Sequence, residues 1–332
     1  MQSLRQNGTV NLAILGYGSI ARQHVRALGA LRERGEEPAL GLEWVMGRVA
    51  ASAAEFAAEF DVRRSTTDLS AVLDDARVDA VLITSPTDVH ADQTEQALRA
   101  GKHVLCEIPL ATSLASGDRL IALADQVDRR LMVCHTERYY PALIEAKRLI
   151  DSGQLQPYSI VSRYMFQRRR NVNWVGRQRS WTDNLLWHHG CHAVDAALWL
   201  LGASEVSVAA QVARPSGQLG IPMDLAIAMR TPRDQIVSVA MSYNSHLPFH
   251  DYLIIGEQMT VLFDNGELRS NTGVVVPRQD LSDLSEPIVD QDREFLQAVR
   301  EQREPAVSGR AVRPAMAALQ VAQDTLTART AG

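Results

Sequence analysis

Three residues that can transfer protons recur at helical spacing near the middle of the chain. His188, His192 and Asp195 stand at positions i, i+4 and i+7 of one apolar segment. That segment, 183–201, is predicted to be a helix, so the spacing places the three side chains on one of its faces. Two imidazoles and a carboxylate there can exchange protons near neutral pH, with one partner orienting another. The structural alternative is a buried, hydrogen-bonded histidine, and Asp195 suits a structural pair equally well.

Clustered histidines are also typical of metal sites. His188 and His192 lack the glutamate of an HExxH motif. The cysteines Cys106, Cys134 and Cys191 are widely spaced and form no CxxC pair, so they indicate neither a zinc cage nor a disulfide framework. We therefore expect no metal, and a reducing, cytoplasmic location.

Six arginines gather just before that helix, in the stretch 163–179. They are Arg163, Arg168, Arg169, Arg170, Arg177 and Arg179. In an otherwise acidic chain they predict an anion site, because guanidinium groups bind carboxylates through paired hydrogen bonds. Asn171, Asn173 and Trp181 lie among them, and the set fits a planar dicarboxylate, with Arg179 and Arg169 expected to contact it first. The alternative is an exposed basic loop or a subunit contact.

A glycine-rich turn near the start of the chain predicts a dinucleotide site. Gly16-Tyr17-Gly18-Ser19-Ile20-Ala21 follows the apolar run Val10–Leu15 and precedes the helical pattern Ile20–Leu31. The first glycine allows a tight turn, and the second lets the backbone approach a pyrophosphate. Ala21 keeps the helix close to the strand, while the helix N-terminus attracts phosphate. Gly16, Gly18, Ser19, Ile20 and Ala21 are therefore expected to contact the cofactor.

The next strand indicates which dinucleotide binds. The strand Leu42–Met46 runs into Gly47-Arg48 and carries no carboxylate at its tip, where NAD-binding proteins usually place one. Arg48 could pair with a 2′-phosphate, so NADP is preferred and NAD remains possible. The alternative is a solvated surface arginine. Thr84, Ser85 and Pro86 follow a further core strand at the ligand-binding edge, although such residues also form ordinary turns.

The strands and helices that must position these residues follow one order in the first part of the chain and another order in the second. Strands and helices alternate up to residue 136, which predicts a doubly wound, parallel Rossmann sheet in a dinucleotide-binding domain, 9–136. Beyond it, strand candidates follow one another with short links, which favours an α+β domain with a mostly antiparallel sheet over 137–332. Helices are expected at Asp290–Glu301 and Ala311–Arg329, and the last could pack back on the first domain.

Composition and net charge limit the kinds of protein that this chain can be. The 332 residues are 46% hydrophobic and 22% charged, which suits a two-domain globular chain. With 34 basic and 39 acidic residues, the formal net charge is -5, which argues against nucleic acid or an anionic membrane as partner. Met1 to Val10 lacks an apolar signal core, and no apolar run approaches the ~20 residues of a membrane span.

Several motifs together carry a resemblance that covers essentially the whole chain. They are the GxGxxA turn, Ser85-Pro86 with His90, Gly101-Lys102-His103-Val104 leading into Glu107, Pro109, Gly190-Cys191-His192-Ala193-Val194-Asp195, and Asp292-Arg293-Glu294-Phe295. The sequence resembles the glucose-fructose oxidoreductase/inositol dehydrogenase (Gfo/Idh/MocA) family. The resemblance implies an NAD(P)-dependent oxidoreductase, with Ser85, His90 and Glu107 near the cofactor, and a homodimer or homotetramer.

Two departures from the family pattern change the expected chemistry. The family typically has Glu-Lys-Pro where this chain has Glu107-Ile108-Pro109, and that lysine commonly assists proton transfer. The family's usual aspartate position holds His188. Both departures resemble one branch, the 4-carboxy-2-hydroxymuconate-6-semialdehyde dehydrogenases, which oxidise a cyclic hemiacetal with NADP. The matching segments are Glu107 to Leu110, Arg168, Arg169, Asn171, Asn173, Arg179–Asp183 and Leu185–His189.

The branch implies a substrate site and a reaction. Arg168, Arg169, Asn171, Arg179, Trp181 and His189 are expected to hold the small carboxylated substrate. His188 or His192, with Glu107, is expected to take part in catalysis, a histidine serving as the base because a hemiacetal hydroxyl is more acidic than an ordinary alcohol. The product would be 2-pyrone-4,6-dicarboxylate. Two other functions stay open: a sugar or polyol dehydrogenase, and a non-catalytic NADP-binding sensor.

Overall fold

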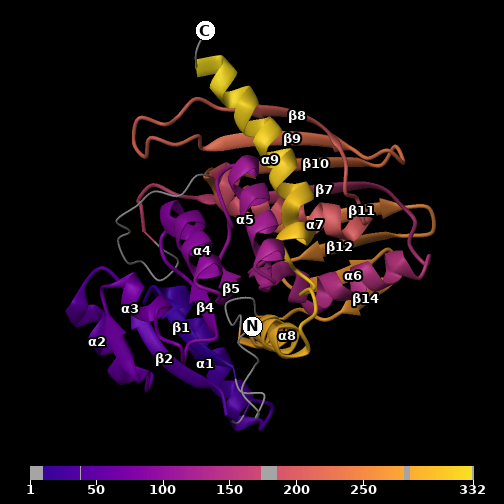
Figure 1. Cartoon of the computed structure of the whole chain (residues 1–332). Coiled ribbons are helices and arrows are strands. Elements are labelled where there is room, and N and C mark those ends of the chain that lie inside the picture. The colour runs from indigo at the N-terminus through magenta and orange to yellow at the C-terminus, as the bar shows by residue number, and fades with distance from the viewer. Residues whose placement is uncertain (1–9, 38, 173–184, 280–284, 331–332) are drawn as a thin grey trace. The chain divides into compact units, whose positions relative to one another are not determined.

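The structure is a computed structural model that describes residues 10–37, 39–172, 185–279 and 285–330. The chain divides into two compact units. The first comprises residues 1–136 and 284–313, and the second comprises residues 137–283 and 314–332. Figure 1 shows the ribbon coloured along the chain.

The first unit is built on a parallel sheet of six strands within the described ranges. Its order is β3-β2-β1-β4-β5-β6, and each neighbouring pair is parallel. The strands are β1 (Asn11–Leu15), β2 (Gly41–Met46), β3 (Arg64–Thr66), β4 (Ala80–Ile83), β5 (His103–Cys106) and β6 (Leu131–Val133). β1 and β4 are buried along their whole length, as apolar runs covered on both faces must be. The predicted doubly wound Rossmann fold is confirmed.

Helices connect these strands. They are α1 (Ser19–Glu33), α2 (Ala50–Glu59), α3 (Leu69–Leu73), η1 (Thr87–Val89), α4 (His90–Arg99) and α5 (Leu114–Gln126). The buried face of α1 includes Ala21, Val25 and Leu28, which recur at helical spacing. Asp68 and Ser113 cap α3 and α5 by accepting hydrogen bonds from backbone amides of the first turn.

The domain assignment made from sequence needs one correction. α8 (Ser285–Glu301) packs against α1 and belongs to the first unit, although it lies inside the range 137–332. Ile288, Phe295 and Leu296 are fully buried on this helix. The body of α9 (Gly309–Thr330), from Pro314 onward, belongs instead to the second unit. The chain therefore returns to the first unit through α8 rather than through most of its last helix.

The second unit contains a sheet of eight described strands in the order β14-β13-β12-β11-β7-β10-β9-β8. All neighbours are antiparallel except β10 and β7, as the sequence predicted for a mostly antiparallel sheet. The strands are β7 (Pro157–Gln167), β8 (Ser207–Val212), β9 (Asp224–Arg230), β10 (Ile236–Ser242), β11 (Asn244–Gly256), β12 (Thr260–Asp264), β13 (Glu267–Ser270) and β14 (Gly273–Val276).

Helices cover one face of this sheet. α6 (Pro141–Asp151) follows the short turn η2 (Thr136–Tyr139), and its first residue is a proline, which suits a position where a helix amide has no partner. α7 (Leu185–Leu201) contacts β7 and β10 and is buried on most sides. A side chain at Gly190 would meet Leu319 of α9 at 3.3 Å, so this glycine lets α7 lie close to α9.

The strands differ widely in length. β3, β13 and β14 have three or four residues each, which is too short for a clear hydrophobic pattern in the sequence, whereas β11 has 13 residues. In the part of the chain that the structure describes, no helix combines the length and the apolar character needed to cross a membrane.

Candidate functional site

The glycine turn of the first unit has the geometry that a dinucleotide needs. Gly16 follows β1 with φ +112°, and an added Cβ would lie 2.7 Å from the backbone of Thr84. Only glycine fits both the dihedral and the contact. At Gly18 an added Cβ would meet nothing within 4 Å. The turn thus leaves open space at the start of α1, where the helix dipole favours phosphate.

Arg48 follows the carboxyl end of β2 beside this turn. Gly16 donates a backbone hydrogen bond to Met46, and Arg48 is exposed two residues further on. Tyr17 lies against Gly47, where an added Cβ would fall 2.0 Å from the ring, and its hydroxyl accepts a hydrogen bond from the amide of Val49. Arg48, which is predicted to select a 2′-phosphate, therefore lies on a loop that packs against the glycine turn.

Thr84 and His90 hold the neighbouring loop through the backbone. The Thr84 hydroxyl donates to the carbonyl of Leu15, which joins the ends of β4 and β1. His90 is buried, and its ring nitrogens face the carbonyls of Ser85 and Pro109 at 2.8 and 2.9 Å. Burial alone would lower the pKa of His90, but Cys106 and the two carbonyls raise it to about 9. His90, predicted as a cofactor ligand, thus contacts the loop that carries Ser85 and Pro86.

Glu107 belongs to a buried ion-pair cluster that the sequence analysis did not identify. His24 of α1 is fully buried, and its Nε2 lies 3.0 Å from Glu107 Oε1 at the end of β5. Its Nδ1 lies 2.9 Å from both carboxylate oxygens of Asp292 on α8. Burial by itself would lower the pKa of His24, but the two carboxylates raise it to about 10. The cluster therefore joins α1, β5 and α8 through a protonated imidazole.

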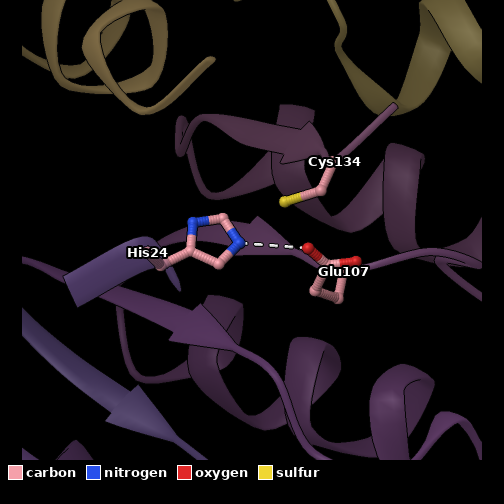
Figure 2. A group of neighbouring side chains, drawn as sticks. All are labelled: His24, Glu107 and Cys134. Carbon is pink, nitrogen blue, oxygen red and sulfur yellow. Dashed lines mark hydrogen bonds and ion pairs between the residues drawn. The ribbon is translucent and has the colours of Figure 1, made fainter. Parts of the chain in front are cut away.

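Cys134 completes a group that could in principle bind a metal ion. Ligand atoms of His24, Glu107 and Cys134 lie within 4.8 Å of one another, and Figure 2 shows the three side chains converging. Both ring nitrogens of His24 already donate to carboxylates, and burial raises the pKa of the Cys134 thiol well above its usual range. A cation would have to displace the proton on the imidazole nitrogen of His24 that faces Glu107 and the proton of the Cys134 thiol. The arrangement therefore favours an ion pair over a metal site. That this chain uses no metal stays a prediction.

The second unit gathers the histidines of α7. His188, His189 and His192 are half-buried on a helix whose other residues are almost all buried. The rings of His188 and His189 meet edge to face with centroids 4.6 Å apart. Asp195 is tied to Arg138 by two hydrogen bonds of 2.6 and 2.8 Å. Of the two roles open to Asp195, the structure shows the structural pair.

Tyr243 connects the histidines to the arginine-rich segment, a role that its strand pattern did not indicate. Its hydroxyl lies 2.5 Å from His189 Nδ1. The Arg168 guanidinium stands over its ring at 5.0 Å and donates to Asn171. Arg169 donates to the Tyr243 carbonyl and to the side chain of Asn244. Arg168 and His189, both predicted substrate ligands, thus contact the same tyrosine, and Asn171, also predicted, is hydrogen-bonded to Arg168.

The remaining arginines separate into different environments. Arg163 pairs with Asp251 and stacks on Phe249. Its guanidinium therefore binds groups of the sheet itself rather than an anion from outside. Arg170 is exposed. Four of the residues predicted for this site lie outside the described ranges: Asn173, Arg177, Arg179 and Trp181.

A buried carboxylate, Glu137 of η2, lies next to the histidines and was also not identified from sequence. His250 Nε2 contacts its Oε1 at 3.0 Å, and the Tyr252 hydroxyl donates to its Oε2 at 2.5 Å. A possible signal was its position in the charged tetrapeptide Thr136–Tyr139, directly after the last Rossmann strand.

The comparisons with known proteins show the family to which the two units belong. A profile described as "Oxidoreductase family, NAD-binding Rossmann fold" matches residues 10–135, and one described as "Bacterial oxidoreductases, C-terminal" matches residues 141–282. The chain is 33% identical over 304 residues to the 4-carboxy-2-hydroxymuconate-6-semialdehyde dehydrogenase of a Sphingobium species, a match covering 89% of this chain and 92% of that protein. Inositol 2-dehydrogenase 2 of Saccharopolyspora erythraea is 32% identical over 211 residues, 63% of this chain and 59% of its own.

Solved structures show the same fold at lower identity. A levoglucosan dehydrogenase in complex with NADH and levoglucosan superposes with a TM-score of 0.85 at 19% identity, covering 96% of this chain and 97% of that one. The UDP-N-acetylglucosamine 3-dehydrogenase of Acidithiobacillus ferrooxidans gives a TM-score of 0.79 at 23% identity, covering 95% and 97%.

Proposed function

The chain belongs to the glucose-fructose oxidoreductase/inositol dehydrogenase family of NAD(P)-dependent oxidoreductases acting on CH–OH groups, and on that premise we propose that it oxidises a carboxylated cyclic hemiacetal with NADP. The proposed substrate is the hemiacetal of 4-carboxy-2-hydroxymuconate-6-semialdehyde or a close analogue. The product is the lactone 2-pyrone-4,6-dicarboxylate.

The reaction requires two transfers, a hydride from the hemiacetal carbon and a proton from its hydroxyl oxygen. The C–H bond of the hemiacetal breaks and its electron pair leaves as hydride, while the hydroxyl proton passes to a base and the C–O bond becomes a carbonyl. NADP, when bound, supplies the hydride acceptor. The turn Gly16–Ala21, with Gly47, Arg48 and the loop Thr84–Pro86, would hold it, as the open space at Gly18 supports.

The observation that carries this proposal is the environment of the α7 histidines. Ile108 occupies the position of the family's lysine and is buried, so the proton must go elsewhere. His188 and His192 are partly accessible, and an imidazole has the pKa needed by a base at neutral pH. Arg168 lies over the Tyr243 ring and donates to Asn171, and the Tyr243 hydroxyl contacts His189, which supports binding of a carboxylate there.

NADP rather than NAD is proposed from the end of β2. Arg48 is exposed there, directly after Gly47, and no carboxylate takes its place. A guanidinium forms paired hydrogen bonds with a 2′-phosphate, whereas a carboxylate would repel it.

A homodimer or homotetramer is proposed from the second face of the eight-stranded sheet. Ile236, Ser159 and Ile255 stand in register across β10, β7 and β11, so they share one face, and Val161 follows on the same face. Ile236, Ile255 and Val161 are 42%, 36% and 37% exposed. Apolar residues grouped in this way are typical of subunit contacts. Light scattering on the wild type and on Ile255→Lys tests it, and a wild-type monomer would reject it.

A coupled absorbance assay tests the reaction. The ring-cleavage product of protocatechuate is generated in situ, the protein is added with NADP or NAD, and reduced nicotinamide is followed while the product is identified. We expect NADP reduction with stoichiometric pyrone dicarboxylate. A parallel panel of inositol and sugars is the control, because other relatives are inositol dehydrogenases. Turnover of a polyol but not of the hemiacetal would reject the proposed substrate in favour of a polyol. NADP binding without any turnover would favour a sensor.

A further inference from the structure

Tyr243 is a fully buried tyrosine at the point where the chain crosses the end of β7. β7 lies between β10 and β11 in the sheet, and Tyr243 is the single residue that joins those two strands. It stands next to Arg168, which directly follows β7, and the Arg168 amide donates to the Tyr243 carbonyl at 2.9 Å. Because Tyr243 is 0% exposed, it cannot touch a substrate itself. Any effect that it has on a ligand must act through the residues that it contacts.

Each part of Tyr243 contacts a residue predicted for the substrate site. The hydroxyl lies 2.5 Å from His189 Nδ1. The ring carries the Arg168 guanidinium, whose carbon stands 5.0 Å from the ring centroid. The carbonyl also accepts a hydrogen bond of 3.2 Å from the guanidinium of Arg169, which donates to Asn244 as well. One buried residue is thus in contact with a histidine and two arginines.

The His189 ring is confined by other rings. The Tyr164 ring lies 4.7 Å from it, centroid to centroid, and the Phe166 ring lies 5.5 Å away, edge to face. His188 meets it at 4.6 Å and Tyr243 at 5.5 Å, both also edge to face. Packing on several sides leaves the imidazole little room to rotate, so the directions of its two nitrogens are fixed.

The contact between Tyr243 and His189 also bears on the tautomer of the imidazole. A tyrosine has one hydroxyl proton, and a neutral imidazole has one nitrogen that donates and one that accepts. A phenol is the stronger donor of the two groups, and an imidazole nitrogen is the stronger acceptor. When the hydroxyl donates to Nδ1, the proton of the neutral ring must be on Nε2. Nε2 is then a donor, which is the polarity that a carboxylate oxygen requires.

We propose that Tyr243 is a positioning residue for the substrate. Its hydroxyl donates to His189 Nδ1 and fixes the tautomer with the proton on Nε2, while its ring holds the Arg168 guanidinium. One side chain therefore sets two donors for the carboxylates of the substrate. The inference rests on the proposed function and deepens it, because it assigns to His189 the binding of a carboxylate rather than the removal of a proton.

The physical reason is that both donors are oriented before the substrate binds. An aromatic face attracts a guanidinium, and the attraction is stronger when the two groups are out of water. Arg168 is only 6% exposed, so this attraction is little screened. Side chains that must first be ordered by a ligand lower its affinity, and here that ordering is already done. The arrangement favours a dicarboxylate over a neutral polyol, which has no charge to pair with a guanidinium.

Two variants separate the two contacts of the Tyr243 side chain. Tyr243→Phe removes the hydroxyl and keeps the ring, so KM for the carboxylated substrate should rise about three- to tenfold. Tyr243→Leu removes the ring as well, and KM should rise by roughly a further tenfold because a desolvated cation–π contact is lost. In both variants kcat should fall less than about threefold. A fall of kcat with unchanged KM in Tyr243→Phe would overturn the inference, since His189 would then act in proton transfer.

Phe263→Leu is the matched control. It removes another fully buried ring of the same sheet, and among the described residues no guanidinium stands over that ring. KM should stay within about twofold of wild type, although the melting temperature falls as in Tyr243→Leu. A rise of KM in Phe263→Leu equal to that in Tyr243→Leu would show that loss of packing alone explains the effect, and the role of Tyr243 would be rejected.

Nitrogen NMR tests the hydroxyl contact without turnover. The ring nitrogens of a neutral histidine show which of them carries the proton, and the His189 signals are identified by their loss in His189→Asn. Wild type should have the proton on Nε2, and Tyr243→Phe should give a mixture of both tautomers. A proton on Nδ1 in wild type, or an unchanged tautomer in Tyr243→Phe, would overturn the role of the hydroxyl whatever the substrate.

Calorimetric binding of isophthalate, a planar dicarboxylate that cannot be oxidised here, tests the arginine contact. Wild type and Phe263→Leu should bind it alike, and Tyr243→Leu about tenfold more weakly or less tightly still. Equal affinity in all three proteins, or no binding to wild type, would overturn the inference. The expected affinities and tautomers in a protein that oxidises no hemiacetal would support the positioning role and reject the proposed reaction.

Discussion

Each unit holds a histidine beside a buried carboxylate, and the two arrangements differ in what they leave available. His24 in the first unit is fully buried, and both of its nitrogens face carboxylates on other elements. In the second unit, Glu137 contacts the half-buried His250 and the Tyr252 hydroxyl, and His192 also lowers its pKa. One cluster has two anions around one imidazole, and the other has one anion among several imidazoles.

The ratio of anions to imidazoles decides what a histidine can do. Two carboxylates fix a proton on His24 at any physiological pH, so that ring can join elements but cannot act as a base. In the second unit, by contrast, one carboxylate lies among rings that are partly accessible. Residue type alone therefore does not separate a structural histidine from a catalytic one.

The largest expected effect is the loss of the base in the second unit. Of His188→Asn and His192→Asn, the variant that removes the base should lower kcat/KM by about 10²–10⁴-fold, the range for removal of a general base. The melting temperature should change little because both rings are half-buried. Steady-state kinetics and thermal unfolding of both variants check this, and near-wild-type turnover of both would reject a histidine base.

Removing the imidazole of the first unit should act on stability instead. His24→Leu leaves Glu107 and Asp292 facing an apolar side chain, and we expect the free energy of unfolding to fall by about 3–5 kcal/mol, as when one partner of a buried pair is removed. Adding Asp292→Leu should recover part of the loss, because a buried unpaired charge is removed. Urea unfolding measures both, and a loss below about 1 kcal/mol would show that the cluster is not an ion pair.

The two clusters should respond to pH on opposite sides of neutrality. The pKa of His24 rises from 6.5 to about 10, so its contribution is complete below about pH 6.5 and is lost as the pH rises through 10. The pKa of Glu137 falls from 4.5 to about 2, so its contribution is present above 4.5 and is lost as the pH falls toward 2. In melting curves His24→Gln should flatten the alkaline limb and Glu137→Gln the acidic one. If His24→Gln changed the acidic limb and Glu137→Gln the alkaline one, the contrast between the two clusters would be wrong.

The smallest effect is expected at the cofactor. Arg48→Ala should weaken NADP about tenfold relative to NAD, near 1.4 kcal/mol, with kcat for saturated enzyme unchanged. KM for both dinucleotides gives the ratio, and Arg34→Ala, an exposed arginine paired with Glu286, is the matched control. If Arg48→Ala left the ratio of the two KM values unchanged, a residue other than Arg48 would determine the cofactor preference.

Local patterns were enough to predict the fold and part of the site. The strand–glycine–helix order around Gly16 and the alternation of strands and helices specify the Rossmann sheet because each signal lies within a few residues. His24 and Glu137 were missed because their partners, Asp292 and His250, lie far away in the sequence. A single histidine on the apolar face of α1 is visible in the sequence, but what it pairs with depends on tertiary packing.

The contact between Tyr17 and Gly47 bears on how cofactor preference could be re-engineered. Because the ring fills the space above Gly47 and its hydroxyl accepts from the amide of Val49, the phosphate turn and the loop before Arg48 are shaped by one side chain. Exchanging Arg48 for an acidic residue would alter the charge but keep that loop conformation. A library for NAD preference should therefore randomise Tyr17 together with residues 47–49, since one side chain holds the turn and the loop in contact.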